Sequence, residues 1–385
     1  MTANRWFIVT LSLIVLCQEL WAQTPDNRLS LVHADMARGR PDVNETVREL
    51  VGNVKFRQGD AVLTCERAIQ FVESGKSVLQ GNVFYKDSVK QLTGRRLTFY
   101  RPRDLFVLDG NARLAEVSKI LTAKSISYDR SSDRAEARMK VLLADTANDL
   151  HIRCEAAVYE QPRGYALCTG NPVFSQADTS NADTLYIHGT RFEMFHNGDT
   201  LLITGDVRMQ RGTMTARCDT LEYFTESERV TLRPVPRVWQ DKDYLTGETI
   251  LLQLQDSELI SADILNNAVA VTAVDSAIQT RVPYDLLTGG DMKVYITDEA
   301  IDSIIVRRQA TSYYHVIDEG RENGVNKALG DLLKIKFSGN ELSKVHLFSD
   351  PGVSNGEFHP KQTQGRLEDE MLEKLNQYRV LEETP

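Results

Sequence analysis

The chain has 385 residues, of which 42% are hydrophobic and 26% charged, so it has enough apolar material for a buried core and is too apolar to be disordered. Its formal net charge of -9 excludes it as a good non-specific partner for nucleic acid, which is bound through Lys and Arg side chains that neutralise phosphates. The same charge disfavours anionic lipid head groups, so an anionic amphiphile would be held mainly by its apolar part.

The first segment is an apolar run over residues 6–16, preceded by Arg5. This pattern is typical of a secretory signal peptide cut after Ala22, and the run is too short to span a bilayer comfortably. A lipoprotein anchored at Cys17 is the less favoured alternative, because the leucine before it is larger than the residue usual at that position. We therefore expect residues 1–22 to be removed and the rest of the chain to lie outside the cytoplasm.

A short phrase then recurs every 29 residues: Gly52-Asn53-Val54, Gly81-Asn82-Val83 and Gly110-Asn111-Ala112. Eleven residues into each copy a second phrase follows: Leu63-Thr64-Cys65, Leu92-Thr93-Gly94 and Leu121-Thr122-Ala123. A period of this size indicates one supersecondary unit repeated many times. Such a chain buries its apolar faces against neighbouring copies.

Within each copy apolar and polar residues alternate, which predicts strands with one buried face. We expect the Gly-Asn pairs and Ser74-Gly75 to supply turns between the strands. The alternation slips between Gly94 and Leu97, so we expect the strand to bend at that small residue. The predicted fold class is all-β, a stacked-repeat β-solenoid of bent strands.

After residue 235 the pattern continues with a period of 42 residues, as in Leu245-Thr246-Gly247 and Leu287-Thr288-Gly289. Three residues after the glycine of each copy comes an apolar residue: Ile250, Met292 and Leu333. Seventeen residues after it comes another: Ile264, Val306 and Leu347. The match over three copies predicts that these positions stack on one another.

Pro234 and Pro236 mark the change of period and give the predicted boundaries. The predicted parts are a signal peptide (1–22), repeats of about 29–35 residues (23–233), a continuous second segment of about 42-residue repeats (234–360) and a charged tail (361–385). The tail has a helical stretch from Leu367 to Leu381, which either caps the last repeat or is free.

Four cysteines follow the signal peptide: Cys65, Cys154, Cys168 and Cys218. Cys65 occupies the position held by glycine or alanine in neighbouring copies, so we favour small buried strand residues. Export permits disulfides, and Cys154 with Cys168 is the best-placed pair because the two would flank one turn of the repeat.

Patterns for catalysis are missing from the sequence. The seven histidines have no metal-ligand spacing, and neither a Gly-rich phosphate loop nor a GxSxG elbow occurs. A polysaccharide-active β-helix would place acidic and basic residues together on one exposed face, and no such group is evident. We predict that the chain is not an enzyme and uses neither metal nor cofactor. Arg95, Arg96, Arg101 and Arg103 form a positive cluster, which we interpret as solvated strand edge rather than a head-group site.

The Gly-Asn-Val-x-Phe opening, followed by Leu-Thr and an alternating apolar pair, resembles the organic-solvent-tolerance (OstA-like) family. The likeness is carried by residues 52–71, 81–99 and 110–128, and more weakly by the copies to about residue 360. That family includes the periplasmic bridge protein of lipopolysaccharide transport and the N-terminal domain of its outer-membrane partner. The resemblance implies a β-jellyroll of V-shaped strand pairs that shields acyl chains during transport to the outer membrane. The chain differs from the bridge protein in its greater length and its 42-residue unit.

Under that resemblance the inward apolar residues are the candidate lipid-binding groove. They are Val54, Phe56, Leu63, Ile69, Phe71, Val83, Tyr85, Leu92, Leu97, Phe99, Leu114, Leu121, Ile126 and Tyr128. From the residues alone a solid core is favoured, which would make the chain a structural β-solenoid scaffold or surface protein. The resemblance favours an open groove, with lipopolysaccharide or a related lipid as ligand and similar β-jellyroll domains joined by strand-edge addition.

Overall fold

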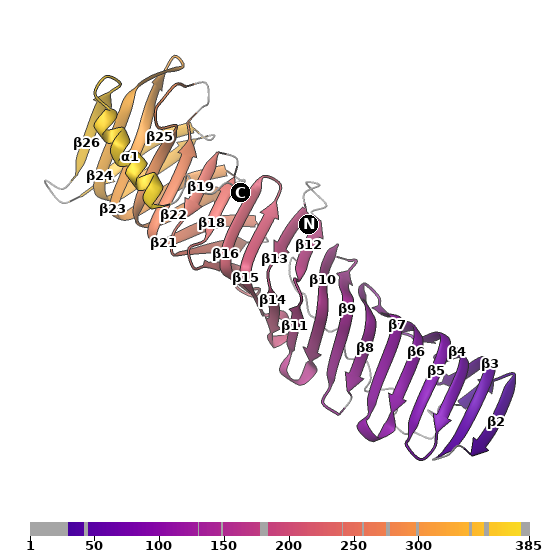
Figure 1. Cartoon of the computed structure of the whole chain (residues 1–385). Coiled ribbons are helices and arrows are strands. Elements are labelled where there is room, and N and C mark those ends of the chain that lie inside the picture. The colour runs from indigo at the N-terminus through magenta and orange to yellow at the C-terminus, as the bar shows by residue number, and fades with distance from the viewer. Residues whose placement is uncertain are drawn as a thin grey trace. The chain divides into compact units, whose positions relative to one another are not determined.

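The structure is a computed structural model that describes residues 30–41, 45–129, 131–147, 149–177, 184–240, 242–255, 258–274, 278–297, 300–338, 341–349 and 354–378. These residues form 26 strands, three short 3-10 turns and one α-helix, and their strands pair antiparallel (Figure 1). The predicted all-β fold class is confirmed. The described residues divide into two compact units, one ending at Ile203 and one beginning at Thr204. The signal peptide lies outside the described residues.

The first unit consists of long strands joined by short turns. Its strands are β1 (Ser30–His33), β2 (Met36–Pro41), β3 (Thr46–Gln58), β4 (Ala61–Phe71), β5 (Lys76–Lys86), β6 (Lys90–Tyr100), β7 (Leu105–Glu116), β8 (Lys119–Asp129), β9 (Arg134–Asp145), β10 (Leu150–Glu160), β11 (Tyr165–Thr169), β12 (Val173–Ala177), β13 (Thr184–His188) and β14 (Arg191–Phe195). Three 3-10 turns occur at Arg101–Arg103, Gln161–Arg163 and His196–Gly198. Each 29-residue copy is thus one antiparallel strand pair.

In every long strand of this unit, the pairing with the neighbouring strand shifts register near the middle. The pairing of β3 with β4 shifts between Val51 and Val54, and the pairing of β5 with β6 shifts between Gln80 and Val83. The Gly-Asn pairs lie at these shifts in the left-handed region, with φ of 76° at Gly81 and 46° at Asn82. The prediction that Gly-Asn ends a strand is therefore wrong. Glycine and asparagine tolerate this conformation, and the extra residue bends the strand as a bulge without ending it.

The second unit holds the remaining strands, of which β21 to β24 are the longest, with 14 to 19 residues each. They are β15 (Thr200–Arg211), β16 (Met214–Phe224), β17 (Arg229–Arg233), β18 (Arg237–Gln240), β19 (Asp243–Thr246), β20 (Thr249–Gln255), β21 (Glu258–Ala273), β22 (Tyr284–Thr297), β23 (Ala300–Asp318), β24 (Arg321–Ser338), β25 (Glu341–Phe348) and β26 (Asn355–Pro360). The helix α1 (Gly365–Gln377) follows them.

The 42-residue positions stack as predicted. Along successive strands the pairing runs Ile250, Ile264, Met292, Val306, Leu333, Leu347. The first five of these side chains are at most 2% exposed, so they form the core beside the bend. The residues three and seventeen positions after each glycine therefore alternate along one row of paired side chains.

Helix α1 packs on the sheet of the second unit and lies across β22, β23 and β24 (Figure 1). Leu367, Met371 and Leu375 point into a buried cluster with seven strand residues and one residue that precedes β22, which are Trp239, Tyr244, Val269, Val271, Leu286, Tyr313, Val325 and Val282. Glu370 accepts a hydrogen bond from the Tyr313 hydroxyl at 2.6 Å and pairs with Lys327 at 2.7 Å. The helical part of the tail is thus a packed element of this unit.

Candidate lipid-binding face

The bend of each strand in the first unit creates an inner face. Val54, Cys65, Leu79 and Val83 form a buried cluster there, although Leu79 lies before the bend of its strand and Val83 after it. Two arms of the sheet therefore face one another across this cluster. We call this surface the inner face and the opposite one the outer face.

On the arm that contains Val54 and Val83, an unbroken apolar row crosses ten strands of the inner face. Each residue pairs with the next across the sheet: Phe56, Leu63, Tyr85, Leu92, Leu114, Leu121, Leu143, Ile152, Phe174 and Ile187. Six of these were predicted as groove residues. The last four lie in the copies whose sequence pattern is looser, which is why the sequence did not reveal them.

On the arm that contains Leu79, a second apolar row faces the first: Leu50, Ala68, Leu79, Leu97, Leu108 and Ile126. Two residues further from the bend, Phe99, Phe106 and Tyr128 pair in a row on the same face. The Phe99 and Phe106 rings are stacked with centroids 4.4 Å apart. Side chains two apart share a face of a strand, so both rows belong to the inner face.

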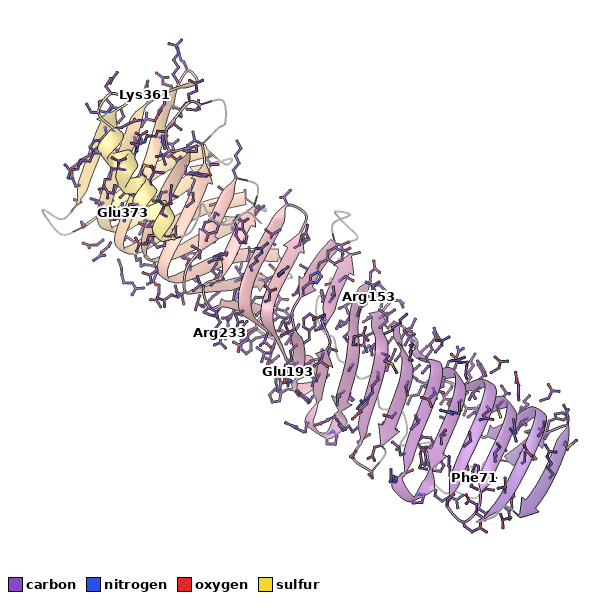
Figure 2. All side chains as sticks on the ribbon, viewed as in Figure 1. Phe71, Arg153, Glu193, Arg233, Lys361 and Glu373 are labelled. Carbon is purple, nitrogen blue, oxygen red and sulfur yellow. The ribbon has the colours of Figure 1, made fainter. Side chains whose placement is uncertain are left out.

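The register places Ile69 and Phe71 on the outer face. Ile69 pairs with Glu49 and Val78, and Phe71 pairs with Val47 and Lys76. In this copy the inner residue is Ala68, five residues after Leu63, whereas Ile69 is six residues after it. One residue of offset reverses the face of a strand side chain. The Phe71 ring, labelled in Figure 2, instead contacts the Lys76 ammonium, 5.4 Å from the ring centroid.

Burial of the inner face changes with distance from the bend. Val54 and Ala112, next to the bend, are 0% and 1% exposed. One step further out, Phe56, Leu63 and Leu92 are half-buried, whereas the other seven residues of that row are at most 9% exposed. The bend is therefore filled by protein, and the accessible apolar surface of this row lies at Phe56, Leu63 and Leu92.

The row that contains Phe99 becomes polar at its N-terminal end. Arg48, Gln70 and Ser77 occupy the positions equivalent to Phe99 on β3, β4 and β5. The sequence analysis predicted Ile69 and Phe71, not Gln70, as the inward residues of this copy. The inner face is thus apolar from β6 onward on this arm and mixed before it.

On the outer face of the same end, Glu49 links three strands. Its side chain is 6% exposed, and it accepts a hydrogen bond from Arg38 at 2.7 Å and another from Arg67. These hydrogen bonds, led by that from Arg38, lower the pKa of Glu49 despite its burial. The pair of arginines holds β2 and β4 to β3.

The four cysteines in the described residues are thiols, and three of them are buried. The thiols of Cys154 on β10 and Cys168 on β11 hydrogen-bond to each other. That contact raises the pKa of Cys168 and lowers that of Cys154. The two cysteines that the sequence paired are therefore neighbours, and the disulfide itself stays a prediction.

The arginine cluster does not converge on one site. Arg96 pairs with Asp109 at 3.0 Å, and Arg95 packs over Gly110 at the next bend. Arg101 and Arg103 are exposed in the 3-10 turn after β6. Within the described ranges, no three His, Cys, Asp or Glu side chains are grouped to hold a metal. A helix long and apolar enough to cross a membrane is also missing from the described part of the chain.

Comparison with known proteins gives two family matches that adjoin. Residues 26–151 match the family described as OstA-like protein, and residues 151–258 match the family described as LptA/(LptD N-terminal domain) LPS transport protein. The chain matches no curated protein. Among solved structures it is similar to LptH from Pseudomonas aeruginosa, described as the LptA homologous periplasmic component of the lipopolysaccharide transport device. The identity is 14%, the match covers 29% of this chain and 80% of LptH, and the TM-score is 0.27.

Proposed function

Because residues 26–151 belong to the OstA-like family and residues 151–258 to the LptA/LptD N-terminal family of lipopolysaccharide transport proteins, we propose that this chain is a periplasmic lipid-binding protein. It shields the acyl chains of lipopolysaccharide on the inner face during transport to the outer membrane. It performs no chemical step, and partner proteins drive the movement.

The observation that carries this proposal is the unbroken apolar row on the inner face, from Phe56 to Ile187. An acyl chain lying along it would cross strand after strand without meeting a polar side chain of that row. Each methylene removed from water contributes about 0.8 kcal/mol, so several acyl chains could bind tightly without strong head-group contacts. This agrees with the acidic charge of the chain.

Strand edges support the proposed partners. At the start of the first unit, β1 and β2 pair with β3, and Leu31, Val32 and Met36 on them are about half exposed. An edge strand offers unpaired backbone groups to a further strand. A similar β-jellyroll domain could add there and extend the inner face.

Photo-crosslinking from two matched aromatic positions tests the proposal. The chain from residue 23 carries a photoreactive phenylalanine in place of Phe99 on the inner face or Phe71 on the outer face, and is irradiated with lipopolysaccharide. We expect at least about fivefold more lipid adduct at Phe99. Equal adducts at both positions, or none at either in variants with unchanged circular dichroism, would support the solid β-solenoid instead.

A further inference from the structure

A polar pocket of about 850 Å³ lies in the second unit, where the bends of β21, β22 and β23 approach the C-terminal end of α1. Two successive 42-residue repeats build it, since Arg308 and Gln309 repeat the positions of Asn266 and Asn267. All four residues have positive φ, between 53° and 62°. A second pocket of about 520 Å³ shares Glu248, Asn267 and Tyr378 with the first.

The pocket opens on the side of the second unit's sheet on which α1 packs. Thr288 and Thr311 line it, and Thr288 pairs with both Thr311 and Val269, which packs against α1. A Cβ atom on the neighbouring Gly289 would instead point to the opposite side, 2.3 Å from the Val306 side chain. The pocket and the core row of Ile264, Met292 and Val306 therefore lie on opposite sides of this sheet.

The lining mixes hydrogen-bond donors and acceptors. Asn267 donates to Glu248 at 3.0 Å, which orients the amide and the carboxylate side by side. Gln309 adds a second amide, and Lys374 adds an ammonium from α1. Tyr378 contributes an aromatic ring with a polar tip. Burial raises the pKa of Tyr378.

This chemistry discriminates between ligand classes. Glu248, Asn267 and Gln309 are exposed to solvent, and an acyl chain would displace their water without offering hydrogen bonds in return. The lining carries both signs of charge, because Glu248 lines both pockets, Lys374 lines the larger one, and Arg308 is paired with Asp291. A compound with many hydroxyl groups suits the lining, because each hydroxyl both donates and accepts.

We propose that this pocket binds a saccharide, with a sugar ring against Tyr378 and its hydroxyls bonded to Glu248, Asn267, Gln309 and Lys374. The sugar portion of a lipopolysaccharide and an unrelated envelope glycan present the same hydroxyl-rich chemistry. The proposal does not depend on lipid binding, since the pocket lies in the second unit and the apolar rows proposed to bind lipid lie in the first.

Isothermal titration of the chain from residue 23 tests the proposal with two probes. One is the core oligosaccharide released from lipopolysaccharide by mild acid, and the other is chitotetraose. We expect at least one probe to bind, and Glu248→Gln and Tyr378→Ala each to weaken that binding at least about tenfold. Tyr378→Phe, which keeps the ring, should remain within about threefold of the unchanged protein.

Glu66→Gln is the matched control, because Glu66 also accepts a hydrogen bond from a bend asparagine, Asn82, but in the first unit. It should leave binding unchanged. Binding of only one probe identifies the source of the saccharide and supports the proposal. Failure of both probes to bind, or full binding by Glu248→Gln, would overturn it. Crosslinking from Phe99 should be the same in all these variants, which separates this result from the lipid proposal.

Discussion

The packing of α1 against the second unit predicts a large and local loss of stability in Met371→Ala. Met371 is 0% exposed and points into the cluster with Tyr313 and Val325. The change removes the thioether and two carbons beyond Cβ and leaves a cavity between helix and sheet. Buried Met→Ala substitutions cost about 2–5 kcal/mol, and the full burial of this side chain favours the upper half of that range.

Trp239 allows this loss to be measured where it occurs. In a chain that starts at residue 23 it is the only tryptophan, and it belongs to the same buried cluster as Met371. Its fluorescence during urea unfolding therefore reports on the sheet that α1 covers. With a slope of about 1–3 kcal/mol per molar urea, a loss of about 3 kcal/mol moves the midpoint by about 1–3 M.

Glu373→Ala is the control, because Glu373 lies on the same helix but is exposed (Figure 2). It should change the free energy of unfolding by less than about 0.5 kcal/mol. If Met371→Ala also stays within that limit, α1 does not pack on the sheet as described.

Three further measurements probe the first unit. Glu49→Gln should lower the melting temperature at neutral pH, because the arginines on either side hold the pKa of Glu49 below its ordinary value of 4.5. A lowered folded-state pKa stabilises above the ordinary value, so the difference between variant and parent in thermal melts should shrink below about pH 4.5, and a constant difference would contradict it. Gly81→Ala should cost about 1–2 kcal/mol in urea unfolding, since φ is 76° and the new Cβ would meet Glu66 at 2.2 Å, whereas Gly356→Ala has open space and should be near neutral. Protein purified without reductant should show two titratable thiols after unfolding if Cys154 and Cys168 form a disulfide, and four thiols would show that they do not.

The repeat explains why the arrangement of strands was predictable. Alternation within a strand and the 42-residue spacing of Ile264 and Val306 are local and periodic features, and the sheet register reproduces them. The face of individual residues was less predictable. Both Ala68 and Ile69 can be read as inward, and only the pairing across β3, β4 and β5 decides between them.

The bends at the Gly-Asn pairs were also only partly predictable from the sequence. Gly-Asn suits a turn and a bulge equally, because both need left-handed backbone. Whether the chain reverses there depends on whether the next residues keep pairing with the same neighbour. In β3 they do, so the strand continues from Thr46 to Gln58.

The sequence by itself determined that this protein is a stack of repeated strands, since its periods and alternation are properties of neighbouring residues. Only the tertiary structure decided which apolar residues share the inner face, that α1 covers one side of the second unit's sheet, and that two repeats and the helix enclose a polar pocket. These features depend on contacts between residues far apart in the chain. A bulge of one residue is enough to move a side chain to the opposite face of its strand.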